Sequence, residues 1–208
     1  SEAISNWVWG GCGSDDAHKG STDNDQEEIA DVEKHDIVPT NDYLEGKWGA
    51  VYAGVQRAND VIRIMAQVKD GSISPDEMTE SKAEAVFLRA VYHLEAAKLW
   101  RNVPYVTDSI SYDNGNYDVP NPGPIWSQLE TDFSYAAANL PPTQQDLGRA
   151  NSWAAKAFLA KVYMFEQKFN DAKTLLADII ANGVTPSGQK YALVNFADTY
   201  EYSWHTPG

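Results

Sequence analysis

The sequence has little of what marks several common protein classes. It holds one cysteine, Cys12, among 208 residues, so no disulfide can form within the chain. No apolar run reaches the roughly 18 residues that a membrane-spanning helix needs. Basic residues are scarce, since 16 Lys and Arg stand against 30 Asp and Glu, for a formal net charge of −14. Nucleic acids and anionic lipids are bound through basic patches, so this charge balance argues against both partners.

Familiar catalytic and metal-binding motifs are also missing. The four histidines show no His-Glu-x-x-His spacing, and the chain has neither a Gly-x-Ser-x-Gly elbow nor a P-loop. Asp15 and Asp16 would suit a glycoside hydrolase or a Ca²⁺ loop, but carboxylate pairs in so acidic a chain are usually solvated. We therefore expect no catalytic residue, no metal site and no cofactor, and we interpret the chain as a binding protein rather than an enzyme.

Helical periodicity dominates the sequence after residue 40. Apolar residues make up 43% of the chain, enough to bury a core. Over residues 41–68 they recur at steps of three and four, the spacing of one helix face: Leu44, Trp48, Val51, Val55, Ala58, Ile62 and Met65. The same spacing over residues 75–100 predicts a second helix, antiparallel to the first across a short connection. Further helices are predicted over residues 125–139, 151–167 and 170–181.

Caps and small residues add detail to the first helix. Thr40 or Asn41 can accept hydrogen bonds from the free N–H groups of its first turn. Gly46, Gly49 and Gly54 each weaken it by roughly 1 kcal/mol relative to Ala. Packing against a neighbour must therefore hold the helix, and the small residues allow that neighbour to come close.

Residues 149–183 fit the pattern of one tetratricopeptide hairpin. The pattern's positions are occupied by Ala160, Tyr163, Phe169, Ala172, Leu176 and Ile179. The two alanines let the helices approach while the aromatic residues fill the flanks, and Asn182-Gly183 supplies a left-handed C-cap. Such repeats bury their faces against neighbours. We therefore predict an all-α fold of tetratricopeptide-like helical hairpins stacked in an array, with long irregular loops.

Three segments lack this periodicity. Residues 1–40 are polar and glycine-rich, with short helical pieces expected at 2–7 and 26–34. Cys12 lies there without the basic and apolar stretch of a lipoprotein signal, so we interpret it as a free thiol in a glycine-rich loop. Residues 101–124 contain the turn signal Asp113-Asn114-Gly115 and several prolines, which predicts a long loop that is either ligand-facing or only a surface connection. The tail holds a possible short strand at 191–194 and then Phe196, Tyr200, Tyr202 and Trp204.

Aromatic and acidic residues gather near the start of the chain. Trp7, Trp9, Asp15, Asp16 and Tyr43 lie in or beside the first loops. Sugars are bound by stacking their C–H faces on aromatic rings, while carboxylates accept hydrogen bonds from the hydroxyls. These residues are therefore the candidate ligand-binding residues, although Trp7 and Trp9 fit at least as well as core anchors for a loop.

Several motifs, in order, resemble the SusD/RagB family of nutrient-binding outer-membrane lipoproteins. Residues 48–62, WGAVYAGVQRANDVI, are similar to the family's W-x3-Y-x-G-I-x-R-A-N-x-V-I helix. Residues 84–90, EAVFLRA, and 99–104, LWRNVP, resemble its E-A-x-F-L-R-A helix and L-W-G-x-V-P exit. Residues 132–151 contain a match to D-x3-A-x3-L-P followed by G-R-A, and residues 14–17 to an S-D-D-A segment near the start.

The resemblance implies a tetratricopeptide-repeat fold wrapped by loops. It also implies a place at the cell surface, on the outer membrane, and a role in polysaccharide utilisation. There the family captures oligosaccharides or polysaccharides for a SusC-like TonB-dependent transporter. The family's lipid-anchored cysteine and first helix are not found here, so contact with the membrane would run only through an anchor that this chain lacks. The family's chain continues past a position like Gly208, which implies an N-terminal portion.

Three parts follow from these observations. We expect residues 1–40 to form a loop-rich segment packed on the helical domain, residues 41–183 to form the tetratricopeptide-like domain, and residues 184–208 to begin a C-terminal segment that is truncated here. The leading hypothesis is a cell-surface glycan-binding protein that serves nutrient uptake. The alternative, on the hairpin alone, is an adaptor for proteins or peptides. A hydrolase using Asp15 or Asp16 is the third.

Overall fold

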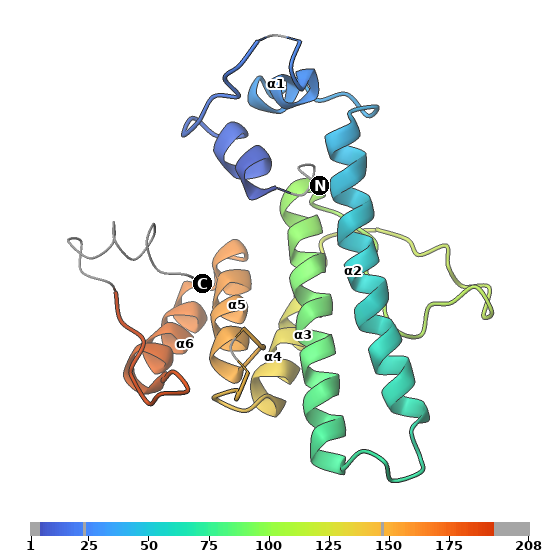
Figure 1. Cartoon of the computed structure of the whole chain (residues 1–208), viewed down its shortest axis with the longest axis vertical. Helices are drawn as coiled ribbons and strands as arrows, with labels where there is room; N and C mark the ends of the chain where they lie inside the picture. Colours follow the sequence, from blue (N-terminus) through green and yellow to red (C-terminus); the bar gives the residue numbers. More distant parts are fainter. Residues whose placement is uncertain (1–4, 23, 147, 194–208) are drawn as a thin grey trace. The chain divides into compact units, whose positions relative to one another are not determined.

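The computed structural model describes residues 5–22, 24–146 and 148–193, and its regular elements are helices joined by loops (Figure 1). The chain forms two compact units, one of Ser1–Gln67 with Leu88–Ile125 and one of Val68–Phe87 with Trp126–Gly208. The long helix α3 (Pro75–Trp100) contributes to both. Among the described residues no strand forms, so the predicted all-α class is confirmed. The predicted three-part division stays a prediction.

The first unit contains a π-helical turn, η2 (Trp7–Cys12), then α1 (Glu27–Glu33), α2 (Asp42–Gln67) and the second half of α3. The bounds of α2 and α3 lie within a residue of those that the periodicity predicts. Three contacts show that α2 and this half of α3 run antiparallel, as predicted. Lys47 pairs with Glu95, Gly54 lies against Tyr92, and Asn59 bonds to Arg89.

Asn41 caps α2 and also ties it to α1. Its Oδ1 accepts hydrogen bonds from the N–H groups of Tyr43 and Leu44, at 3.1 and 3.2 Å. Its Nδ2 donates to the carbonyl of Glu28 at 3.0 Å, and the residue is only 2% exposed. The cap predicted from sequence is therefore Asn41, and it holds the N-terminal segment as well.

Replacing Asn41 with Ala is expected to cost more than an ordinary cap. The cap accounts for about 1 kcal/mol, and the lost partner of the Glu28 carbonyl for about 1 more. Asn151→Ala is the control, because Asn151 caps α5 through the N–H of Ala154 at 2.9 Å and its second bond, from Nδ2 to Tyr191 Oη at 3.5 Å, is long and exposed. Denaturant unfolding compares the two variants, and an equal loss in both would contradict the role given to the bond with Glu28.

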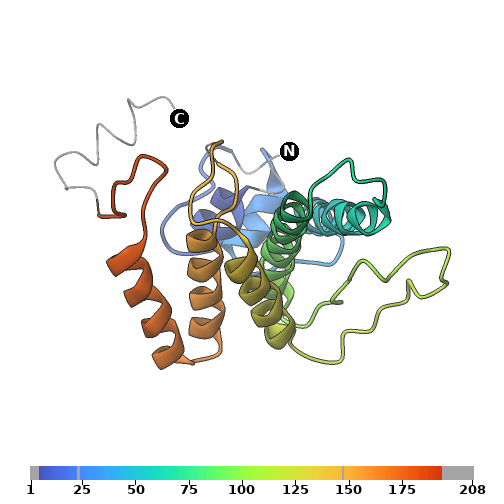
Figure 2. The same ribbon diagram turned by 90° about the horizontal axis from the view of Figure 1, so that it is seen from below.

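The second unit packs the first half of α3 with α4 (Trp126–Asn139), α5 (Ser152–Phe165) and α6 (Phe169–Asn182). Figure 2 shows α4, α5 and α6 side by side, in the order of the chain. Its centre is a triangle of Phe87, Phe133 and Phe158, with ring centroids 5.4 to 5.8 Å apart. At its surface, Arg149 forms a two-point ion pair with Glu84, through Nε at 2.8 Å and Nη2 at 2.5 Å.

The tetratricopeptide-like hairpin is present as α5 and α6. Ala160 and Ala172 are each 1% exposed on two helices that pack together, as the pattern predicts. The expectation that Phe169 fills the flank is wrong, because Phe169 is the first residue of α6 and is 56% exposed. Leu176, at 42%, is also largely open to solvent.

The left-handed cap predicted at Asn182-Gly183 is also wrong. Gly183 is extended, with φ −64° and ψ 129°. A Cβ at this position would lie 2.5 Å from the carbonyl oxygen of Ile179 and 2.8 Å from the ring of Tyr191. The glycine is needed for space, since the chain turns back here through a Val184–Lys190 bridge and lays Tyr191 against it.

Other expectations have mixed outcomes. The helical piece at 26–34 is α1, and residues 101–124 form the predicted loop. Cys12 closes a π-helical turn rather than sitting in a loop. Residues 191–193 form no strand, and Val194 with the aromatic residues after it lies outside the described residues, as do residues 2–4 of the piece expected at 2–7. No helix within the described ranges combines the length and apolarity needed to cross a bilayer.

Candidate functional site

The N-terminal segment folds around a small apolar cluster in the first unit. The buried members come from η2 and α1: Val8, Cys12, Ile29 and Val32. Trp9 and Tyr43 pack against them while staying partly exposed. Burial raises the pKa of the Cys12 thiol. Because the thiolate is the reactive form, Cys12 serves as a core residue here rather than as a nucleophile.

The loop after η2 is fastened to the end of α1. The carboxylate of Glu33 accepts a hydrogen bond from the Lys19 N–H at 2.8 Å and lies 2.6 Å from His18 Nδ1. These two bonds, the Lys19 one first, lower the pKa of Glu33. His35 has a left-handed backbone, at φ 56°, and its Nε2 lies 3.1 Å from the carbonyl oxygen of Gly13. The loop therefore has a defined position on α1.

A cavity of about 320 Å³ opens beside this cluster. Its walls come from the N-terminal segment, the first turn of α2 and the end of α3: Trp9, Gly13, Val32, His35, Ile37, Leu44, Leu99 and Trp100. This volume lies at the lower end of the range for small-ligand sites. Two indoles, an imidazole and aliphatic side chains face one space, and we call it the Trp9–Trp100 pocket.

The lining of the Trp9–Trp100 pocket offers aromatic surfaces on which a ligand can stack. The face of an indole ring carries negative electrostatic potential and attracts weakly positive C–H groups. A molecule with a C–H face and polar edges, such as a pyranose ring, can stack there. No carboxylate stands among the lining residues, so the pocket does not present the acid and base pair of a glycoside hydrolase.

A row of aromatic contacts leads from Trp100 along the groove between α2 and α3. Neighbouring ring centroids lie 4.6 to 6.1 Å apart in the order Trp100, Trp48, Tyr52, His93 and Tyr105. Tyr52 Oη donates to the carbonyl of Pro104 at 2.9 Å, and burial raises the pKa of Tyr52 above its ordinary value. One wall of the pocket is thus continuous with a row of half-buried aromatic rings that ends at the buried His93 and its neighbour Tyr105.

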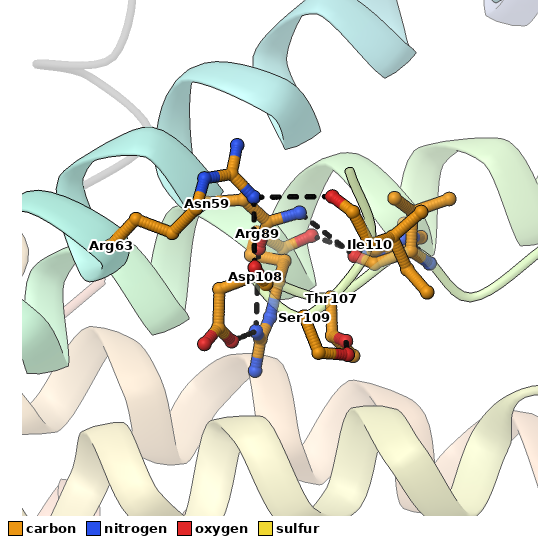
Figure 3. Close-up of polar contacts among 9 residues, drawn as sticks. Asn59, Arg63, Arg89, Thr107, Asp108, Ser109 and Ile110 are labelled. Carbon is orange, nitrogen blue, oxygen red and sulfur yellow. Dashed lines mark hydrogen bonds and ion pairs between the residues drawn. The ribbon is translucent and has the colours of Figure 1, made fainter. Parts of the chain in front are cut away.

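The loop that follows α3 is clamped to both long helices (Figure 3). Arg89, only 7% exposed, donates from Nη1 to Asp108 Oδ1 at 3.2 Å and to Asn59 Oδ1 at 3.4 Å. Arg63 donates from Nη1 to the carbonyls of Asp108 and Ile110, at 2.9 and 3.4 Å. Hydrogen bonds donated by a charged group such as a guanidinium are stronger than those between neutral groups. The base of the 101–124 loop is therefore fixed.

His93 also holds the start of this loop, through hydrogen bonds to α3 and to Val106. Its Nδ1 lies 3.0 Å from the carbonyl oxygen of Arg89, and its Nε2 accepts the Val106 N–H at 3.0 Å. The Val106 carbonyl in turn accepts from Asn59 Nδ2 at 3.0 Å. Burial, then the nearby Arg89 charge, lowers the pKa of His93 to about 3. The imidazole is therefore neutral, with its proton on Nδ1.

The five residues expected to bind ligand are not gathered in one place. Trp9 lines the pocket, and Tyr43 packs on the same cluster without lining it. Trp7 is 47% exposed and lies against Gly11, outside the lining. Asp15 and Asp16 are exposed in the turn after η2. Trp9 thus packs on the cluster and also lines the pocket, while its role in ligand binding stays a prediction.

Sequence reasoning missed Trp100 and His35 as pocket residues. Trp100 belongs to the LWRNVP exit, which was assigned only to a helix end. The antiparallel pairing of residues 41–68 with 75–100 could have placed it beside the start of the first helix. Nothing in the sequence signals His35, because its position depends on a left-handed backbone and on the fold of the preceding loop.

Comparison with known proteins gives consistent matches. Residues 12–164 match the SusD-like family described as starch-binding and associating with the outer membrane. A SusD-like protein of Bacteroides ovatus is 30% identical over 173 residues, 80% of this chain and 32% of that protein. A laminarin-binding SusD-like protein of known structure superposes with a TM-score of 0.75 at 27% identity, over 88% of this chain and 40% of that one.

Surface glycan-binding protein A of Bacteroides thetaiotaomicron, solved in complex with laminarihexaose, superposes with a TM-score of 0.70. It is 21% identical, over 89% of this chain and 38% of that one, and supports the fold alone. The chain spans about a third of the length of the Bacteroides ovatus relative. The ordered motifs, the helical hairpins and a family match over most of the chain agree, and the chain belongs to the SusD-like family.

Proposed function

We propose that this chain is part of a cell-surface glycan-binding protein of the outer membrane, and that it binds rather than cleaves its ligand. The observation that carries the proposal is the Trp9–Trp100 pocket, whose lining combines indole faces with aliphatic walls and includes no carboxylate. Family membership supports the same reading, since the family is described as starch-binding. The laminarin-binding relative makes β-glucan oligosaccharides the first ligands to test.

Removing an indole from the pocket is expected to weaken glycan binding by up to about tenfold. The loss of one stacking surface corresponds to at most about 1.4 kcal/mol, within the range for aromatic stacking. Trp100→Ala and Trp9→Ala test this by calorimetry with laminarihexaose and with hexasaccharides of cellulose, starch, xylan and mannan. Trp9→Phe accompanies them because Trp9 also packs on the buried cluster.

Trp126→Ala is the matched control, because Trp126 stacks on Phe165 in the second unit at 5.3 Å and lies outside the lining. Its affinity should equal that of the unmodified chain. A larger loss in Trp7→Ala than in Trp100→Ala would move the ligand from the pocket to the exposed N-terminal loop. The absence of binding to every hexasaccharide would sink the proposal.

Delivery to a SusC-like TonB-dependent transporter is the further part of the proposal. It rests on the family's description as associating with the outer membrane. Expression of the longer native protein with a candidate barrel, followed by purification through the barrel, tests it. If the barrel is recovered without the SusD-like protein, delivery to the transporter is overturned, whereas the proposal of glycan binding still stands.

A protein- or peptide-binding adaptor is the second candidate. It is favoured by one observation, the large apolar side chains exposed on α6: Phe169 at 56%, Leu176 at 42% and Ile180 at 72%. Ile180→Glu separates the candidates, because it should leave hexasaccharide affinity unchanged and abolish capture of any protein that docks on this helix.

A further inference from the structure

The tip of the 101–124 loop carries two tyrosines that are exposed together. Tyr112 is 85% exposed and Tyr117 is 60% exposed. Their ring centroids are 5.0 Å apart and their planes are inclined by 38°. Aromatic side chains normally bury most of their area. Tyr112 has the most exposed aromatic side chain among the described residues.

The tip is ordered by its own hydrogen bonds. Asn116 Oδ1 accepts the Ser111 N–H at 2.9 Å, and Asn116 Nδ2 donates to the Ser109 carbonyl at 2.9 Å. Asn114 Nδ2 also donates to the Ser109 carbonyl, at 3.3 Å. Gly115, at φ 65°, closes the turn by donating its N–H to the Tyr112 carbonyl at 3.1 Å. These bonds fix the backbone of the turn between the two tyrosines, and both rings remain exposed.

The base below the tip is fixed as well. The carbonyls of Asp108 and Ile110 bind Arg63, and the Asp108 carboxylate binds the buried Arg89 (Figure 3). Thr107 Oγ1 and Ser109 Oγ lie 2.8 Å apart across the same bend. A binding surface set on a fixed base loses less conformational entropy when it binds. Tyr112 and Tyr117 therefore form an exposed aromatic surface that is preorganised for binding.

The charges around the tip select the class of ligand. Asp113 and Asp118 are exposed, and their carboxylates have no hydrogen-bond or ion-pair partner among the described residues. Between Arg101 and Arg149 the sequence has no Lys or Arg, so the tip itself carries no cationic side chain that could bind a phosphate or another anion. Carboxylates accept hydrogen bonds from hydroxyls, and tilted ring faces receive C–H groups. A hydroxyl-rich ring with an apolar C–H face, a pyranose, matches both features.

We propose that Tyr112 and Tyr117 form a second carbohydrate-binding contact, in which the two rings stack on a pyranose unit while Asp113 and Asp118 accept hydrogen bonds from its hydroxyls. The ligand class rests on the proposed function, whereas the position of the contact rests on the loop alone. This contact is separate from the Trp9–Trp100 pocket, because no residue of the tip lines that pocket.

Nuclear magnetic resonance of the chain with ¹³C-labelled tyrosine rings tests the contact directly. Tyr112→Phe and Tyr117→Phe assign the two signals. Both signals should shift and saturate when laminarihexaose, or one of the other four hexasaccharides, is added. Tyr112→Ala and Tyr117→Ala should each weaken that response roughly three- to tenfold. The Phe variants should keep it, and both sites are exposed, so all four variants should fold.

Each outcome decides something. Shifts at Tyr112 and Tyr117 that persist in Trp100→Ala support a second contact. A hexasaccharide that saturates the pocket, seen by tryptophan fluorescence, without moving either tyrosine signal would overturn the second contact and leave the proposed function standing. If none of the five hexasaccharides changes the tyrosine signals or the tryptophan fluorescence, both the second contact and the proposed function are overturned. A response of the tyrosines to a Lys- and Arg-rich peptide instead of sugar would overturn the carbohydrate assignment in favour of a cationic partner.

Discussion

Replacing Gly54 with Ala is expected to destabilise the first unit by about 1 to 2 kcal/mol, although Ala is the better helix former. A Cβ at Gly54 would lie 2.5 to 2.6 Å from three atoms of the Tyr92 ring. Forcing a methyl group into such a contact typically costs about 1 to 3 kcal/mol and sometimes more. The gain in helix propensity of about 1 kcal/mol offsets only part of this cost. Hydrogen exchange of the α2 amides measures the change.

Gly49→Ala is the control in the same helix. A Cβ at Gly49 meets nothing within 4 Å, so this variant should be more stable by about 1 kcal/mol. The double variant Gly54→Ala, Tyr92→Ala tells whether the clash is the cause, since removing the ring should remove most of the penalty of the Gly54 change. If Gly54→Ala stabilises the unit as much as Gly49→Ala does, the close approach is not a constraint.

Much of the helical framework could be predicted from sequence. The three-four spacing of Val51, Val55, Ala58 and Ile62 places them all on one buried face of α2. Pro75 begins α3 and Gly54 permits the close neighbour that its size suggested. These features depend on residues that are near one another in sequence, where periodicity and capping rules apply.

The family motifs were informative for a physical reason. Glu84 and Arg149 come from two separate motifs and form one ion pair. Asn59 and Arg89 likewise come from two motifs and meet in the buried clamp. These residues hold helices and loops in place, so they identify the fold, and none of the four lines the pocket.

Features that depend on distant contacts could not be predicted. Gly183 looked like a left-handed cap, but Tyr191 and the turn after it decide its conformation. Phe169 looked like a flank filler, yet the helix starts there and leaves it exposed. The sequence alone does not distinguish a ligand-facing 101–124 loop from a simple connection, because the clamp at its base depends on contacts between distant residues and the pairing of its two exposed tyrosines depends on the fold of the turn between them.

Lowering the pH from 6.5 to 4.5 is expected to destabilise the first unit by about 2 to 3 kcal/mol through His93 alone. In the unfolded chain His93 titrates near 6.5, whereas its pKa in the fold is about 3. Between these two pKa values the His93 side chain is protonated in the unfolded state and neutral in the folded state. Stability is complete above pH 6.5 and falls by about 1.4 kcal/mol per pH unit until the folded pKa is reached.

The groups around His93 explain why it stays neutral. Arg89 is a buried cation beside it, and Tyr52 and Tyr105 cover its ring faces and edges. A proton on Nε2 would also face the Val106 N–H, which now donates to that nitrogen. Protonation would therefore release the bend at Val106 that begins the clamped loop.

His93→Gln is the variant that isolates this effect, because a glutamine amide oxygen can accept the Val106 N–H and does not titrate. It should be less stable than the unmodified chain at pH 7.5, yet lose little more between pH 6.5 and 5. Hydrogen exchange of the amides of α2 and the second half of α3 gives the opening free energy at each pH. The window lies above the range in which Glu33, whose pKa is lowered, takes up its proton. Equal slopes in the two proteins would mean that His93 does not set the acid limit of the fold.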